Sequence, residues 1–148
     1  MIERGTILVV DDSQNDIDLL LRTFKQLGVG NRIEVCRTAD EAEHYLQTNE
    51  LPAVMLLDLK MPEKVGFFVL RRVKTDPQLT DLVVIVLTTS DNVGEIRLAY
   101  ELGANSFLTK PLHLDEFKMM IDAFHKYWIT HAQPAPKRGK LITPEQAA

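Results

Sequence analysis

Four short apolar segments of this 148-residue chain each end in, or are followed by, residues that can do chemistry. In chain order these residues are Asp11 and Asp12, Asp58, Thr88 and Thr89, and Lys110. Carboxylates that lie close together repel one another unless a cation sits among them, and oxygen ligands of this kind suit Mg²⁺. A hydroxyl and an ammonium group beside them suit an anion. Such a set is suited to phosphoryl transfer, in which a carboxylate acts as the nucleophile and forms an acyl phosphate.

The apolar segments themselves have the pattern of strands. The candidates lie at residues 6–10, 33–36, 53–57, 82–87 and 106–109. The third and fourth are apolar on both faces, as strands of a parallel sheet covered by helices must be. Between the segments, apolar residues recur every three or four positions, which predicts helices. Five strands that alternate with five helices predict an open α/β sheet with right-handed crossovers.

This predicted sheet explains why the chemical residues should meet. In an open parallel sheet, ligands bind at the carboxyl ends of the strands. An aspartate after a strand is by itself commonly a helix cap or a turn residue, so each residue alone favours a structural explanation. The joint placement of complementary groups at four strand ends reverses that judgement. The buried segment at 53–57 would then be a rigid support for Asp58.

The composition of the chain argues against several classes of protein. A formal net charge of −4 disfavours nucleic acid as a direct partner, because nucleic-acid-binding domains usually carry a basic face. We see no signal-peptide pattern and no apolar run of membrane-spanning length, so we expect a cytoplasmic protein without a membrane partner. The single cysteine, Cys36, excludes an internal disulfide.

The character of the sequence changes near residue 132. Residues 1–131 are predicted to form one domain, and residues 132–148, which have three prolines and no periodicity, to form a flexible tail. Lys137, Arg138 and Lys140 make the tail basic. A solvated tail is the favoured interpretation of this basic cluster, and contact with an acidic partner is the alternative.

Four blocks of the sequence, in order, resemble the response-regulator receiver domains of bacterial two-component signalling. The blocks are "VVDDS" (9–13), "LLDLKMP" (56–62), "VLTTS" (86–90) and "FLTKP" (107–111). The intervals between them are usual for that family, and the resemblance covers about residues 5–131. It implies a flavodoxin-like, doubly wound (βα)5 fold with a five-stranded parallel sheet in the order 2-1-3-4-5.

The resemblance implies a metal-dependent phosphoacceptor. Asp58 would accept the phosphoryl group. Asp11, Asp12, Asp58 and the backbone carbonyl of Lys60 would hold Mg²⁺, for which Mn²⁺ can substitute. The protein would then promote only its own phosphorylation and dephosphorylation, and would not be an enzyme in the usual sense.

The resemblance also implies how phosphate is held and how the signal leaves. Thr88, Thr89 and Lys110 would bind the phosphoryl oxygens, and a cis Lys110–Pro111 bond would aim the lysine into the site. Thr88 would be drawn toward the phosphoryl group, and Phe107 would turn into the space it leaves. This switch would repack the face made by the fourth helix, fifth strand and fifth helix.

The fifth predicted helix has an apolar arc wider than one packing face needs. Its central stripe comprises Leu114, Phe117, Ile121, Phe124 and Trp128. Two interpretations stay open: a broad core stripe partly covered by neighbours, or a homodimer interface on the same face. The residues assigned to that interface are Phe117, Met120, Tyr127 and Trp128.

The expected partner is a sensor histidine kinase. The blocks "DLVVIVLTTS", "YELGANSFLTKP" and "FHKYWIT" resemble the small response regulators paired with bacterial phytochrome kinases. One alternative is a phosphorelay shuttle that serves another kinase and a histidine phosphotransfer protein. A second is a pseudo-receiver, an interaction module that no longer takes phosphate.

Some residues depart from the common family pattern, and two other classes of protein are disfavoured. Val65 stands where an aspartate is frequent, while Lys60 and Ser90 occupy positions that tune dephosphorylation in the family. A dehalogenase-type hydrolase would need a second aspartate at position 60 as its general acid/base, and this chain has Lys60 there. A nucleotide-binding module would need a glycine-rich phosphate loop, and "DDSQND" follows the first strand instead.

Overall fold

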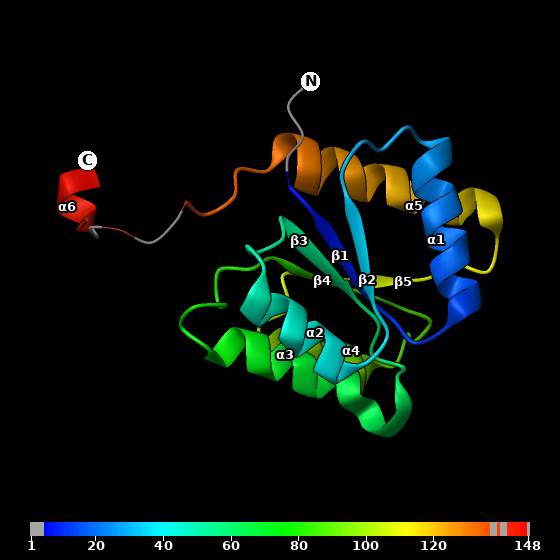
Figure 1. The fold of residues 1–148 in the computed structure, drawn as a ribbon, viewed down its shortest axis with the longest axis horizontal. Coiled ribbons are helices and arrows are strands. Elements are labelled where there is room, and N and C mark those ends of the chain that lie inside the picture. Colours follow the sequence, from blue (N-terminus) through cyan, green and yellow to red (C-terminus); the bar gives the residue numbers. More distant parts are fainter. Residues whose placement is uncertain (1–4, 137–138, 140–141, 148) are drawn as a thin grey trace.

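The computed structural model describes residues 5–136, 139 and 142–147. Its centre is a five-stranded parallel sheet in the order β2-β1-β3-β4-β5 (Figure 1). The strands are β1 (Ile7–Val10), β2 (Ile33–Cys36), β3 (Val54–Leu57), β4 (Val84–Thr88) and β5 (Ser106–Thr109). The predicted doubly wound fold and its strand order are confirmed.

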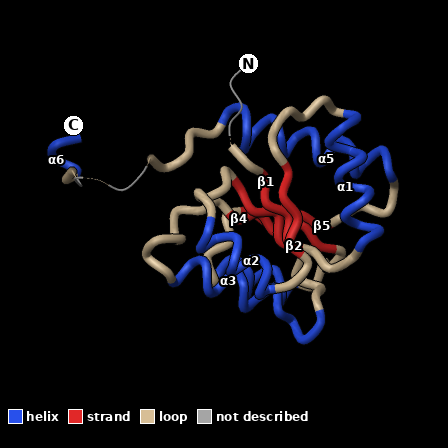
Figure 2. The backbone as a smooth tube through the Cα atoms, in the orientation of Figure 1, coloured by secondary structure: helices blue, strands red, loops and turns tan. Residues whose placement is uncertain are grey.

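Helices cover both faces of this sheet (Figures 1 and 2). The five main helices are α1 (Gln14–Gln26), α2 (Ala39–Thr48), α3 (Val65–Thr75), α4 (Val93–Glu101) and α5 (Leu114–Phe124). Helices α1 and α5 pack on one face, while α2, α3 and α4 pack on the other. A 3₁₀ turn (Pro62–Lys64) precedes α3, and a π-helical segment (His125–His131) continues α5. A short helix, α6 (Pro144–Ala147), lies in the segment predicted to be a flexible tail.

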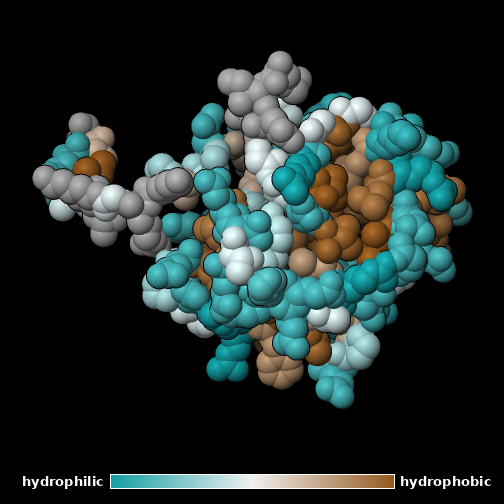
Figure 3. All heavy atoms as spheres, viewed as in Figure 1, coloured by the Kyte–Doolittle hydropathy of each residue, from teal (hydrophilic) through white to brown (hydrophobic). Residues whose placement is uncertain are grey.

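The core consists of two apolar layers, one on each side of the sheet. Alternate residues of β1 serve different layers: Ile7 and Val9 face α1 and α5, whereas Leu8 and Val10 face the other helices. All four are buried. Burial of each such side chain is worth roughly 1.5–3 kcal/mol, so the central strands form a rigid support. The edge strand β2 is only partly buried, and Figure 3 shows apolar atoms at the surface on the side of β2 and α1.

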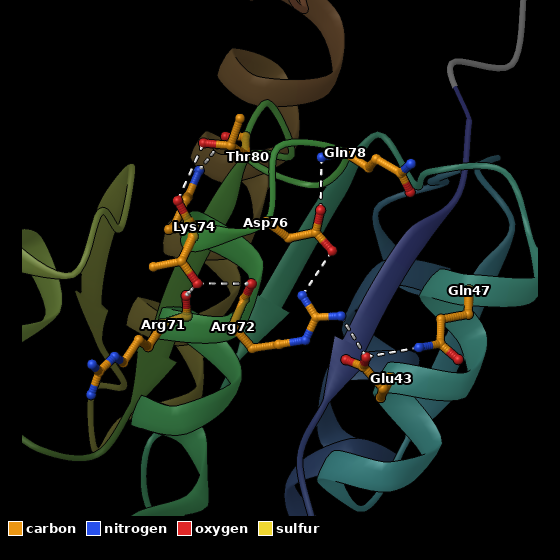
Figure 4. A network of polar contacts seen from close by, with 9 residues as sticks. Glu43, Gln47, Arg71, Arg72, Lys74, Asp76, Gln78 and Thr80 are labelled. Atoms are coloured by element: carbon orange, nitrogen blue, oxygen red, sulfur yellow. Dashed lines mark hydrogen bonds and ion pairs between the residues drawn. The ribbon is translucent and has the colours of Figure 1, made fainter.

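Polar contacts tie the helices to one another and to the sheet. Arg72 of α3 forms ion pairs with Asp76 at 2.7 Å and with Glu43 of α2 at 2.9 Å (Figure 4). Lys74 donates to the carbonyl of Leu82 at 2.6 Å and to the side chain of Asn105 at 3.0 Å. These contacts connect the end of α3 to the segments that lead into β4 and β5.

One residue of the predicted core stripe lies elsewhere in the structure, and one predicted cluster falls outside the described part of the chain. Leu114 is 66% exposed and is not part of the core stripe of α5. The predicted basic cluster at 137, 138 and 140 lies outside the described residues. Thr38 caps α2, because its Oγ1 accepts the N–H of Glu41 at 3.0 Å. No helix among the described residues is long and apolar enough to cross a membrane.

Gly66 lets α3 begin directly against the backbone that follows β3. A Cβ atom at this position would lie 2.5 Å from the carbonyl oxygen of Asp58 and 2.7 Å from the Cα of Leu59. Both neighbours are backbone atoms at the end of a buried strand, so they have little freedom to move. The start of α3 and the position of Asp58 are therefore coupled through a glycine.

We predict that Gly66→Ala lowers the free energy of unfolding by about 1–3 kcal/mol, because overpacking against backbone outweighs the better helix propensity of alanine. Urea unfolding followed by circular dichroism measures the change. Gly30→Ala is the matched control, since a Cβ there meets no atom within 4 Å. Equal stability of the two variants would show that the α3 start yields to the extra methyl group.

Candidate functional site

The carboxyl edge of the sheet brings the predicted chemical residues to one level. Backbone bonding continues one residue past the strands: Asp11 N–H donates to Cys36 at 3.1 Å, and Asp58 N–H donates to Val10 at 2.9 Å. On the other side, Lys110 N–H donates to the carbonyl of Thr88 at 2.7 Å. The residues that follow β1, β3 and β5 are therefore held by the sheet ladder and not by a free loop.

Lys110 lies among three carboxylates. Its Nζ is 3.2 Å from Asp11 Oδ2, 3.1 Å from Asp16 Oδ2 and 3.9 Å from Asp58 Oδ2. The lysine side chain is only 10% exposed. One ammonium group cannot balance three carboxylates, so the site has an excess of negative charge that a divalent cation would neutralise.

The backbone orients two of these carboxylates in the same way. Asp11 Oδ1 accepts the N–H of Ser13 at 2.9 Å, and Asp58 Oδ1 accepts the N–H of Lys60 at 2.9 Å. Each aspartate thus bonds the backbone two residues further on, as aspartates in turns commonly do. The first oxygen of each is occupied by the backbone, which leaves Oδ2 of both residues directed at Lys110.

Asp16 was missed by the sequence analysis. It lies in the first turn of α1, whose cap Ser13 accepts the N–H of Asp16 at 3.3 Å. The signal was present, because an acidic residue one turn into a helix that starts after Asp11 can point back to the strand ends. The sequence pattern does not specify the direction in which α1 leaves the sheet, and this direction decides whether Asp16 reaches the site.

The carboxylates of Asp11, Asp16 and Asp58 offer oxygen atoms within 4.8 Å of one another. This is the donor chemistry that Mg²⁺ or Mn²⁺ prefers, so the residues present fit such an ion. Asp12 does not belong to this cluster. Its side chain is exposed and lines a neighbouring groove with Arg37, Met61 and other residues.

Burial changes the proton affinity of the site. The pKa of Asp11 is raised to about 6, chiefly by burial and also by the charge of Asp58, while hydrogen bonding from the Ser13 N–H and the charge of Lys110 oppose the increase. Burial alone would lower the pKa of Lys110, but the surrounding carboxylates outweigh it and raise the pKa. Lys110 therefore stays charged, and the charge of Asp11 carries a desolvation cost.

Thr88 has an unusual environment for a hydroxyl group. It is fully buried at the end of β4, and its Oγ1 has no hydrogen-bond partner among the described residues. A buried polar atom without a partner costs roughly 1–3 kcal/mol, and a ligand oxygen within reach of this hydroxyl would remove that cost. The neighbouring Thr89 is exposed, whereas Ser90 is buried and bonds the carboxylate of Glu95.

The switch residue and the predicted interface residues lie in different surroundings. Phe107 is half-buried, and its N–H donates to the hydroxyl of Tyr100 at 3.1 Å. Phe117, expected at a dimer interface, is only 4% exposed and lines the pocket beside Lys110. That expectation was wrong for Phe117, because the residue faces the core layer formed by α1 and α5.

The expected cis Lys110–Pro111 bond was also wrong, since the described part of the chain has no cis peptide bond. With the trans bond, Lys110 Nζ still reaches Asp11 and Asp16. The β5 ladder places the lysine beside the carboxylates, so a cis Lys110–Pro111 bond is not needed to direct its side chain into the site.

The fold and this site define a class of protein. The model of the family described as "Response regulator receiver domain" matches residues 7–122. The chain belongs to the response-regulator receiver family.

Individual relatives share both the length and the fold of the chain. FilR2 of Methanothrix harundinacea (strain 6Ac), a probable methanogenesis regulatory protein, is 37% identical over 128 residues, 83% of each chain. Response regulator Rcp1 of Synechocystis sp. (strain ATCC 27184 / PCC 6803 / Kazusa) is 33% identical over 129 residues, which are 83% of this chain and 88% of Rcp1.

Solved structures extend the comparison. The Mn²⁺-bound form of Rcp1 superposes with a TM-score of 0.81 at 30% identity, covering 89% of this chain and 99% of Rcp1. The phosphorylated cyanobacterial phytochrome response regulator RcpA superposes with a TM-score of 0.83 at 29% identity, covering 90% and 99% of the two chains.

The raised pKa of Asp11 predicts that Asp11→Asn stabilises the metal-free protein. The ordinary pKa of an unfolded aspartate is near 3.9, so the cost of the buried charge is full above about pH 6 and disappears as pH falls toward 4. We expect a gain of about 1–3 kcal/mol at pH 7.5 that shrinks at pH 4.5. Urea unfolding in the presence of a chelator measures it.

Asp12→Asn is the control for this prediction, because it removes an exposed neighbouring carboxylate. A pH-independent gain, or the same gain in both variants, would contradict the assignment of the cost to the burial of Asp11.

Proposed function

We propose that this chain receives a phosphoryl group on Asp58 from a sensor histidine kinase and passes the signal on through protein contacts. The observation that carries the proposal is the position of Asp58, which is 6% exposed at the end of β3 with Oδ2 directed at Lys110. The buried, unpaired hydroxyl of Thr88 supports it, since a phosphoryl oxygen would supply the hydrogen-bond partner that this group lacks.

The site residues would carry the transfer in one step. Asp58 Oδ2 attacks the phosphorus of a phosphohistidine, the new P–O bond forms as the P–N bond breaks, and the imidazole nitrogen leaves with the electron pair. Lys110 then pairs with one phosphoryl oxygen. The hydroxyl of Thr88 donates to another, with Thr89 at the rim of the site.

Asp11, Asp12, Asp58 and the backbone carbonyl of Lys60 would hold Mg²⁺. Mn²⁺ is a reasonable substitute, because the similar protein Rcp1 has been solved with Mn²⁺. When bound, the ion supplies positive charge that neutralises the phosphoryl oxygens. The excess negative charge around Lys110 supports this part of the proposal, since a single ammonium group leaves it uncompensated.

In this proposal the site acts on the protein's own aspartate and turns over no separate substrate, as suits a signalling protein. It would promote only its own phosphorylation and dephosphorylation. Lys60 is exposed next to Asp58, and buried Ser90 follows β4 by two residues. These two side chains border the acyl phosphate, and we propose that they tune its lifetime.

The signal would leave through the surface formed by α4, β5 and α5. Phosphate would draw Thr88 away from its place at the end of β4, and Phe107, which packs from the edge of the core, would turn inward. A homodimer through this surface remains part of the proposal. Tyr127, 56% exposed, packs edge-to-face on Trp128 and, with half-buried Met120, offers an apolar contact.

A phytochrome-type kinase in the cytoplasm is the proposed partner. The support is the similarity to RcpA, which is described as a phytochrome response regulator. A phosphorelay shuttle between another kinase and a histidine phosphotransfer protein is the second candidate. The intact acceptor, lysine and acidic residues argue against the pseudo-receiver alternative.

Phosphorylation by acetyl phosphate tests the core of the proposal. With Mg²⁺, intact mass spectrometry should show one added phosphoryl group on the wild type and none on Asp58→Asn. A chelator should abolish the gain. Asp18→Asn, an exposed change on α1, is the control and should be phosphorylated like the wild type. Phosphorylation of Asp58→Asn to the same level would place the acceptor elsewhere.

Because the Thr88 hydroxyl has no hydrogen-bond partner, we predict that Thr88→Val slows phosphorylation without lowering the stability of the fold. Valine has nearly the same shape and removes a buried polar atom without a partner, so the metal-free fold should be as stable or about 1 kcal/mol more stable. Phosphorylation by acetyl phosphate should slow at least tenfold, because a donor to the phosphoryl oxygens is lost. Urea unfolding and the rate of mass gain measure the two effects. A marked loss of stability would mean that the hydroxyl has a structural partner.

A further inference from the structure

The contacts of Lys110 raise the question of what holds this lysine in place once a divalent cation is bound. In Asp11 and Asp58 the first oxygen is bonded to backbone N–H, and the second oxygen faces Lys110. A cation that binds Asp11 through Oδ2 would therefore compete with the lysine for that atom, and a cation on Asp58 Oδ2 would lie beside the ammonium group and repel it. The proposed function nevertheless needs Lys110 to stay beside Asp58.

We propose that Asp16 is a positioning residue that holds Lys110 at the site when a divalent cation takes the oxygens of Asp11 and Asp58. This inference rests on the proposed function. Asp16 provides the shortest of the three lysine contacts, 3.1 Å, and it does so from a different element, the first turn of α1.

The surroundings of Asp16 suit this role better than those of the other two aspartates. Its side chain is 38% exposed, whereas those of Asp11 and Asp58 are 8% and 7% exposed. Keeping its charge therefore costs less desolvation. The helix fixes its backbone, because Ser13 caps α1 through the N–H of Asp16.

Lys110 itself has little freedom to leave. Its backbone is tied to Thr88 by the β5 ladder, and its side chain is almost fully buried. Without Asp16, the carboxylates near Lys110 would be those of Asp11 and Asp58, whose Oδ2 atoms face the lysine. The lysine would then compete with the cation for those atoms. Asp16 thus promotes cation binding by giving the lysine another partner.

A different role would leave a different signature. Asp16 offers an oxygen within 4.8 Å of those of Asp11 and Asp58, so direct binding of the cation is the alternative. If Asp16 were a ligand, its removal would weaken the cation whether or not Lys110 were present. If Asp16 acts through Lys110, its removal matters only while the lysine is there.

The test is a double-mutant cycle on Mg²⁺ affinity, measured by isothermal titration calorimetry without a phosphodonor. The proteins are the wild type, Asp16→Asn, Lys110→Met and the double variant. We expect Asp16→Asn to weaken Mg²⁺ binding on the order of 10-fold, as removal of a group that orients a metal site commonly does. In the Lys110→Met background the same change should alter affinity by less than about twofold.

Asp18→Asn controls for general loss of negative charge on α1 and should leave Mg²⁺ affinity within about twofold of the wild type. Asp16→Glu, which keeps the carboxylate, should recover most of the affinity. Far-UV circular dichroism confirms that every variant is folded before titration.

Two results would overturn the inference: an equal loss in both backgrounds, which makes Asp16 a ligand, or no loss in either. Failure of the wild type to bind Mg²⁺ would be a separate result. It would overturn the metal-dependent function on which the inference rests.

Discussion

The uncompensated negative charge at the carboxyl edge of the sheet is the feature on which the rest of the structure depends. Three carboxylates surround one ammonium group, and two of the carboxylates are almost fully buried. Such a cluster is unfavourable in the free protein, as the raised pKa of Asp11 indicates. In the proposed function, a divalent cation would offset this negative charge, and the cation and Lys110 together would accommodate the phosphoryl oxygens.

The scaffold supplies the stability that this site lacks. Two apolar layers enclose the central strands, and the sheet ladder extends through Asp11, Asp58 and Lys110. The backbones of these charged groups are therefore fixed, which keeps the side chains near one another. The buried hydroxyl of Thr88 is a second local cost tolerated for the same reason. In the proposed function, a divalent cation would relieve the cost of the carboxylate charge, and a phosphoryl oxygen would give the Thr88 hydroxyl a partner.

Much of this arrangement was predictable from local patterns. Continuous apolar runs predicted the buried strands. The chemical residues at the ends of these runs were predicted to meet at one edge of the sheet; they are Asp11, Asp58, Thr88 and Lys110. Asp16 escaped because its relevance depends on the direction of a helix and not on its spacing. Phe117 was misplaced for a related reason: periodicity identifies the apolar side of a helix but not how much of that side the sheet covers.

The switch, the homodimer and the choice of partner depend on more than local sequence patterns. The switch of Phe107 concerns a difference between two packings, and the homodimer concerns a second copy. Partner choice is set by surfaces whose complement lies on another protein.

The most direct test of the account is to locate the phosphoryl group chemically. After incubation with acetyl phosphate and Mg²⁺, sodium borohydride reduces an aspartyl phosphate to homoserine, and tandem mass spectrometry of the digested protein identifies its position. We expect homoserine at position 58 and an unmodified aspartate at positions 11, 12 and 16. Homoserine at one of those other positions, or incorporated phosphate that leaves position 58 unchanged, would contradict it.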